Sequence, residues 1–198
     1  MPFKSYIYQN LFTYRLGMNL LYKGKYEERF SAVCRLLNSG SVTELCFADT
    51  FIAECCREKG ITWTGIDIHE GFVRSAIKKN YNAVAGDLNS METFPEADTC
   101  IIAGSLYHFH ENIESFFKKM LHCAPRIIIS EPVMNLSSRN GIIGKLAQLS
   151  ASVNGENHSF RYTEESLTDL LNRLSIKLNF QYNIESRSGK DLIISIRR

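Results

Sequence analysis

The sequence has no large excess of charge, no long apolar run and no apolar leader. Its net charge of +2 is too small to indicate a nucleic acid or a membrane surface as partner. No apolar run approaches the ~20 residues that a membrane-spanning helix needs. The first twelve residues also lack the apolar core of a signal peptide. We therefore expect a cytoplasmic protein that binds neither nucleic acid nor a membrane.

The sequence also lacks the cysteine and histidine spacings that are typical of metal sites. None of the six cysteines belongs to a Cys-x-x-Cys pair, and His69, His122 and His158 are isolated. We interpret the cysteines as reduced core residues and expect no metal and no disulfide frame. There is no internal repeat, linker or low-complexity tract. A chain of 198 residues with 44% hydrophobic and 22% charged residues predicts one globular domain, 1–198.

The chain is organised around residues 41–67, which predict a strand, a tight turn, a helix and a second strand. The first strand is the apolar run 42–46, and in the turn Asp49 or Thr50 can cap the helix through a side-chain oxygen. The second strand presents Asp67 at its carboxyl end, where ligands bind in open α/β sheets. An acid about 20 residues past the first turn can accept hydrogen bonds from ribose hydroxyls.

Strands and helices continue to alternate up to residue 131. Strands at 82–86, 97–104 and 126–130, separated by amphipathic helices, predict βαβ units and a parallel sheet. Residues 105–110 form a loop, and Glu131-Pro132 closes the fifth strand. The polar stretch 135–162 contains one weak helix, at 142–153. A better helix begins at Thr163, and strands near 177–184 and 191–197 form a hairpin.

Residues 1–38 predict two helices, the first of them rich in tyrosine. We interpret both as a helical cover packed on the sheet. The alternative is that Tyr14, Tyr22, Tyr26 and Arg29 help to roof a ligand site, because a tyrosine ring offers an apolar body with a polar tip.

Residues 42–50 resemble the first motif of the class I S-adenosylmethionine-dependent methyltransferases, in which an acid precedes three alternating glycines. Glu44 supplies the acid, but Cys46, Ala48 and Thr50 stand where the family has glycine. Glycine lets the backbone approach a ligand closely, so each side chain takes up room beside the cofactor. Alanine is a small change, whereas threonine is a large one.

The resemblance covers roughly residues 40–198 and implies an α/β fold. The family has a Rossmann-like, doubly wound sheet of seven strands, mostly parallel with an antiparallel last strand, and helices on both faces. The domain would then comprise an N-terminal helical cover (1–38), a cofactor-binding half (41–131), a substrate-side insertion (132–162) and a C-terminal helix and hairpin (163–198).

Later motifs of the family follow in order. Gly65 to Ile68 resembles the second motif, whose acid holds the cofactor ribose, and Gly86-Asp87-Leu88 resembles the third, whose Asp contacts the adenine amino group. Ser105 to Phe109 resembles the loop after the fourth strand. The resemblance thus implies S-adenosyl-L-methionine as cofactor, bound by residues from all these motifs: Glu44, Cys46, Phe47, Ala48, Thr50, Asp67, Ile68, Asp87, Leu88 and Ser105.

The same resemblance implies methyl transfer to a small molecule. His108, Tyr107 and Glu131 are candidate catalytic residues, because an acceptor hydroxyl or protonated amine needs a base and histidine suits neutral pH. A hydrogen-bonded structural role is the alternative for His108. The nearby aromatic residues favour a small, partly apolar acceptor.

Two other functions fit the same residues. The altered turn also allows a catalytically inactive module that binds S-adenosylmethionine or S-adenosylhomocysteine. A Rossmann-like enzyme that uses another nucleotide is the third possibility, since fold alone does not fix function. The absence of Gly-x-Gly-x-x-Gly argues against a nicotinamide cofactor.

Overall fold

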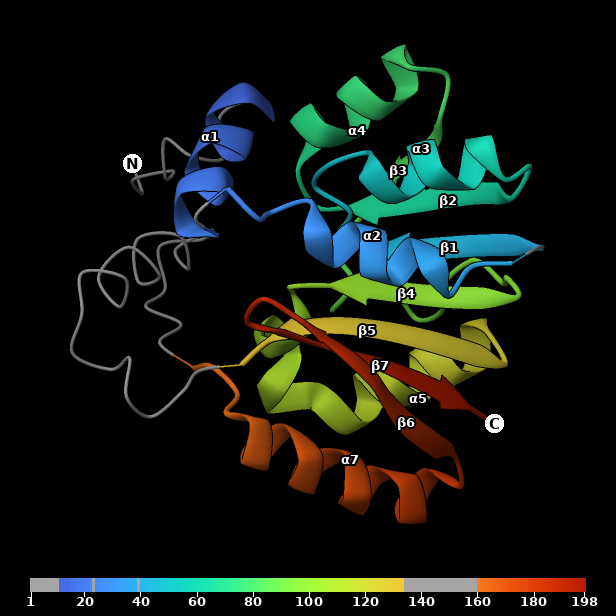
Figure 1. Cartoon of the computed structure of the whole chain (residues 1–198). Coiled ribbons are helices and arrows are strands. Elements are labelled where there is room, and N and C mark those ends of the chain that lie inside the picture. Colours follow the sequence, from blue (N-terminus) through green and yellow to red (C-terminus); the bar gives the residue numbers. More distant parts are fainter. Residues whose placement is uncertain (1–10, 23, 39, 134–159) are drawn as a thin grey trace, which may run out of the picture.

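A seven-stranded sheet forms the centre of the computed structural model, which describes residues 11–22, 24–38, 40–133 and 160–198 (Figure 1). The strands are β1 (Ser41–Leu45), β2 (Thr62–Asp67), β3 (Asn82–Ala85), β4 (Thr99–Ala103), β5 (Arg126–Pro132), β6 (Gln181–Ser188) and β7 (Asp191–Arg197). Their order in the sheet is β3-β2-β1-β4-β5-β7-β6. Strands β1 to β5 pair in parallel, and β7 runs antiparallel to both of its neighbours. The predicted mostly parallel sheet with an antiparallel last strand is confirmed.

Helices cover both faces of the sheet, as predicted. The helices α2 (Glu28–Arg35), α3 (Phe51–Glu58) and α4 (Glu70–Lys78) contribute to one apolar core, and α5 (Ile113–Cys123) and α7 (Glu164–Leu178) contribute to the other. Side chains of a strand point alternately to its two faces. Strand β5 accordingly sends Ile127 and Ile129 into one core and Ile128 into the other.

The helix α1 (Leu11–Leu21) lies beyond the carboxyl ends of the parallel strands (Figure 1). Its Tyr14 packs on Phe72 of α4, with ring centroids 5.2 Å apart. The next helix, α2, packs through Phe30 and Val33 on the face that it shares with α3 and α4. The two N-terminal helices therefore lie at different places, α1 at the carboxyl ends of the strands and α2 on one face of the sheet.

The segment after β4 is helical, whereas the sequence predicted a loop at 105–110. Residues Leu106–Asn112 form a 3₁₀ helix, η2. Leu106, Tyr107 and Phe109 are buried, and the Phe109 ring stacks on Phe116 with centroids 3.8 Å apart. Burial of three large side chains in four residues requires the backbone to turn tightly and to satisfy its own polar groups.

Two predicted boundaries in the second half of the chain are wrong. Helix α7 continues to Leu178 and ends at Asn179, which has φ of +54°, so β6 begins at Gln181 and not near Lys177. Strand β5 includes Glu131-Pro132 because both residues pair with the start of β7. The helix predicted at 142–153 lies outside the described residues.

Three further observations concern the described residues as a whole. None of their helices has both the length and the apolar character to cross a bilayer. No group of three or more His, Cys, Asp or Glu side chains among them is arranged to hold a metal ion. All six cysteines are free thiols.

Candidate functional site

The turn between β1 and α3 has the backbone conformation of a glycine-rich turn, although it contains no glycine. Cys46 and Ala48 have φ of +54° and +45°, in the left-handed region that favours glycine. This conformation costs a residue that carries a Cβ roughly 1–2 kcal/mol. Thr50 has φ of −91° and needs no glycine. The strain therefore falls on Cys46 and Ala48, and not on Thr50, the largest of the three replacements.

Asp67 holds this strained turn from the neighbouring strand. Its Oδ2 accepts a hydrogen bond from the Ala48 N–H at 3.0 Å, and its Oδ1 accepts one from the His69 N–H at 2.8 Å. Burial raises the pKa of Asp67 above its ordinary value, while the two backbone hydrogen bonds lower it. The carboxylate that the sequence assigned to a ribose thus also links the end of β2 to the turn.

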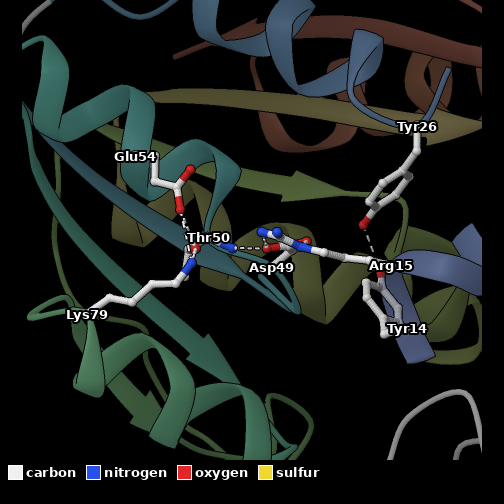
Figure 2. Close-up of polar contacts among 7 residues, drawn as sticks. All are labelled: Tyr14, Arg15, Tyr26, Asp49, Thr50, Glu54 and Lys79. Carbon is white, nitrogen blue, oxygen red and sulfur yellow. Dashed lines mark hydrogen bonds and ion pairs between the residues drawn. The ribbon is translucent and has the colours of Figure 1, made fainter. Parts of the chain in front are cut away.

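Asp49 holds the turn from the other side through α1. Arg15 donates two hydrogen bonds to its carboxylate, from Nε to Oδ2 and from Nη2 to Oδ1, both at 2.7 Å (Figure 2). The Asp49 side chain is 0% exposed, whereas that of Arg15 is 39% exposed. Sequence reasoning assigns Asp49 no role beyond capping. In the structure it is the buried half of an ion pair that fastens α1 to the turn.

Of the two residues predicted to cap α3, Asp49 binds a backbone N–H at the helix start and Thr50 does not. Thr50 is the N-cap residue, but its side chain makes no capping hydrogen bond. Its hydroxyl instead donates to Glu54 Oε1 at 2.9 Å and accepts from Lys79 Nζ at 2.7 Å (Figure 2). The Thr50 N–H donates to Asp49 Oδ1. Asp49 therefore satisfies a backbone group at the helix start, and Thr50 joins α3 to Lys79, which follows α4.

Four of the predicted cofactor residues, Cys46, Asp67, Asp87 and Ser105, lie at the carboxyl ends of adjacent strands of the sheet. Burial is the main cause that raises the pKa of Cys46 well above its ordinary value, and the charges of Asp67 and Asp87 add to it. The Ser105 side chain acts in the opposite direction. Groups at the carboxyl ends of β2, β3 and β4 thus influence the pKa of a thiol that follows β1.

Glu44 lies farther inside, in the middle of β1. It is buried, and its Oε2 accepts a hydrogen bond from the Trp63 indole N–H at 2.8 Å. Burial raises the pKa of Glu44 well above its ordinary value. A Cβ at Gly65 would lie 2.1 Å from the Trp63 ring, so this glycine makes room for the indole. Glu44 therefore supports the turn indirectly, through Trp63 and the Phe47 ring that packs on it.

The remaining predicted cofactor residues differ in exposure. Ile68 is exposed, and Asp87 is exposed with its Oδ1 accepting the Asn89 N–H at 2.9 Å. Leu88 and Phe47 are buried, each in a different core. The Leu88 side chain is thus part of the protein interior, while Ile68 and Asp87 are accessible from the edge.

The three candidate catalytic residues lie at the ends of β4 and β5. Glu131 is fully buried, and its two oxygens accept the Leu106 and Tyr107 N–H groups at 3.0 and 3.3 Å. Burial, with Asp191 adding to it, raises the pKa of Glu131 to about 8. The Tyr107 ring lies 4.0 Å from the His108 ring, centroid to centroid. Glu131 therefore fixes the start of η2, which carries Tyr107 and His108.

Comparison with solved structures identifies the architecture. The DhpI-SAM-HEP complex matches with a TM-score of 0.68 and 16% identity, covering 98% of this chain and 95% of that chain. The fold is that of the S-adenosylmethionine-dependent methyltransferases. The plantazolicin methyltransferase BpumL, in complex with a monoazolic desmethylPZN analog and SAH, matches with a TM-score of 0.67 and 15% identity (97% and 88% covered). The 16S rRNA methyltransferase RmtF, in complex with S-adenosyl-L-homocysteine, matches with 0.56 and 18% (91% and 64% covered). No protein-family model and no curated protein matches the sequence.

Within this methyltransferase fold, sequence reasoning missed a buried polar cluster at the end of β5 and the start of β7. Asp191 Oδ2 lies 3.4 Å from Arg29 Nε and accepts the Ser130 hydroxyl at 2.8 Å, and its Oδ1 accepts the Tyr22 hydroxyl at 3.2 Å. The Arg29 guanidinium lies against Gly104, where a Cβ would be 2.1 Å from Nη2. The sequence offers Tyr22 and Arg29 as possible roof residues of a ligand site, but it contains no signal for Asp191.

Proposed function

We propose that this chain binds S-adenosylmethionine at the turn 46–50 and transfers its methyl group to a small, partly apolar molecule. The observation that carries the proposal is the left-handed backbone of Cys46 and Ala48 in a turn without glycine. A strained conformation persists only where surrounding contacts over-determine it, and such strain clusters at functional sites. Here Asp67 and Asp49 supply those contacts.

The residues around the turn fit the proposed cofactor. Asp67 and the accessible Asp87 follow neighbouring strands, as acids that accept hydrogen bonds from ribose and adenine would. Bound S-adenosylmethionine supplies a methyl group that its sulfonium already activates. The chain's own residues then have to hold donor and acceptor in line and exclude water.

A small acceptor is supported by the charge of the chain and by the residues after β4 and β5. A net charge of +2 offers little attraction to RNA. Tyr107 presents an aromatic ring next to His108, which is half-buried and is our candidate base for an acceptor hydroxyl or amine.

Calorimetric titration with S-adenosylmethionine, S-adenosylhomocysteine and nicotinamide dinucleotides tests the proposal. We expect binding of the first two only. Asp67→Ala should weaken this binding roughly tenfold to a hundredfold, because a hydrogen bond to a charged group contributes about 1.5–3 kcal/mol. Asp98→Ala is the matched control, since Asp98 is an accessible acid at the opposite end of β1, where it binds Ser41.

Three outcomes separate the candidate functions. Cofactor binding with methyl transfer from labelled donor to a metabolite mixture supports the enzyme. Cofactor binding without transfer favours the binding module, and tight binding of a dinucleotide in its place contradicts the proposal. Unchanged affinity in a folded Asp67→Ala variant would contradict the assignment of Asp67.

A further inference from the structure

Lys190 places an ammonium group at the edge where β5 ends. It lies in the turn between β6 and β7, and its backbone carbonyl accepts the Val133 N–H at 3.0 Å. Its Nζ lies 3.9 Å from the centroid of the Tyr22 ring. The side chain is half-buried. A lysine in such a place normally has a carboxylate partner, because burial of an unpaired charge is unfavourable.

The adjacent carboxylate is already bound to other groups. Asp191 binds Arg29 and accepts the hydroxyls of Tyr22 and Ser130. Across residues 11–22, 24–38, 40–133 and 160–198, no carboxylate lies within ion-pair distance of Lys190. Its contact in this part of the chain is the face of the Tyr22 ring.

A second cation, Arg161, lies near the same end of β5, because the ring that it contacts belongs to Tyr107, whose N–H binds Glu131. The Arg161 guanidinium carbon is 3.5 Å from the centroid of the Tyr107 ring, and its Nη1 donates to the Phe160 carbonyl. Burial lowers the pKa of Lys190 to about 8; Asp191 opposes this shift, whereas Arg29 and Arg161 add to it. Glu131, with a pKa of about 8, is mostly protonated at neutral pH. Positive charge therefore exceeds negative charge around Lys190.

We propose that Lys190 and Arg161 bind a negatively charged group of the methyl acceptor, which makes the acceptor a small organic anion. That this anion is the methyl acceptor rests on the proposed function, whereas the anion site itself does not. Arg161 stacks on an aromatic ring and keeps further N–H donors for a planar carboxylate. The rings of Tyr22 and Tyr107 lie against the two cations, so aromatic groups border both charges.

Calorimetric titration with benzoate and benzamide tests this site. The two probes share a ring and a similar size, and only benzoate is charged. In protein saturated with S-adenosylhomocysteine, we expect benzoate to bind at least about tenfold more tightly than benzamide. Lys190→Gln and Arg161→Gln should each remove most of this preference, and Lys190→Arg should keep it. Lys118→Gln should also keep it, because Lys118 pairs with Glu114 on α5.

Each outcome of these titrations either supports or overturns the proposed anion site. Equal binding of the two probes, no binding of either at millimolar concentration, or a preference that survives in Lys190→Gln would overturn the proposal. The same titrations without S-adenosylhomocysteine separate the two proposals. If the cofactor does not bind but benzoate still binds through Lys190, the anion site stands and the methyltransferase assignment fails. Unfolding in urea verifies that each variant is folded.

Discussion

Two arginines from the N-terminal helices bind two buried aspartates, and the two pairs differ in their access to water. We call the first the turn pair (Arg15 and Asp49) and the second the core pair (Arg29 and Asp191). Both aspartate side chains are 0% exposed, whereas Arg15 is 39% and Arg29 is 4% exposed. The turn pair fastens α1 to a strained turn at the carboxyl edge of the sheet. The core pair lies in the interior with Tyr22 and Ser130 and fixes α2 to β7 of the sheet.

The difference indicates that the N-terminal cover has two functions. Removing one member of a fully buried pair leaves a charge with no route to water, so the core pair should matter mainly for folding. Arg15 can reach solvent if its partner is removed, so the turn pair should matter mainly for the shape of the turn. Four changes test this distinction.

The largest effect should follow from breaking the core pair. Asp191→Ala leaves Arg29 buried without a carboxylate, and we expect a loss of about 3–5 kcal/mol in the free energy of unfolding, measured in urea. Glu28→Ala on the same helix is the control. Glu28 pairs with Lys25 on the surface, and its removal should change stability by less than about 0.5 kcal/mol. A loss of stability in Asp191→Ala as small as that in Glu28→Ala would mean that Arg29 is solvated.

The pH dependence of stability should reveal Glu131, the carboxyl next to the core pair. Its folded pKa of about 8 exceeds the unfolded value of about 4.3, so the folded state holds a proton that the unfolded state releases. The stabilisation is complete below the unfolded pKa and is lost as the pH rises through about 8. We expect Glu131→Gln to flatten this decline in urea unfolding measured from about pH 5 to 8. Glu165→Gln, on the surface of α7, should leave it intact.

The turn pair should respond asymmetrically to loss of its two members. Arg15→Gln leaves Asp49 charged and buried, and should cost about 2 kcal/mol, whereas Asp49→Asn should cost less because Arg15 can turn to water. The double variant should recover part of the loss. Urea unfolding gives the stabilities, and calorimetry with S-adenosylhomocysteine tests whether binding falls with Arg15→Gln. Equal and additive losses would contradict the proposed difference between the pairs.

The smallest effect should come from relieving strain in the turn. Ala48→Gly removes a Cβ from a residue with φ of +45° and should stabilise the protein by up to about 1 kcal/mol, with equal or tighter binding of S-adenosylhomocysteine. Ala53→Gly, in the middle of α3, should destabilise it by at least about 0.5–1 kcal/mol. The two substitutions are chemically identical and should differ in sign. A loss of stability in Ala48→Gly would show that the turn is unstrained.

The strands and most of the helices could be predicted because their signals are local. Apolar runs at 42–46, 97–104 and 126–130 mark strands buried on both faces, and β1, β4 and β5 lie there. The end of α7 also had a local signal, since Asn179 is one of the few residues that readily adopt the left-handed conformation at a helix end. The prediction of a strand from Lys177 ignored it.

The ion pairs could not be predicted, because their members are far apart in sequence. Asp49 pairs with Arg15 across 34 positions, and Asp191, the partner of Arg29, also binds Tyr22 across 169 positions. The conformation of the turn was hidden for another reason. The side chains at the three glycine positions indicated crowding beside the cofactor, whereas the backbone of Cys46 and Ala48 adopts the conformation that glycine favours, and Asp67 binds the Ala48 N–H.

The position of β7 has a consequence for how the chain folds during synthesis. This strand follows all the others in sequence, yet it lies between β5 and β6. Until residues 191–197 have left the ribosome, both neighbours present unpaired backbone edges, and unpaired edges invite pairing with other chains. Arg29 likewise lacks its partner Asp191 until more than a hundred and fifty further residues have been synthesised. The nascent chain therefore cannot complete its interior before residues 191–197 have left the ribosome.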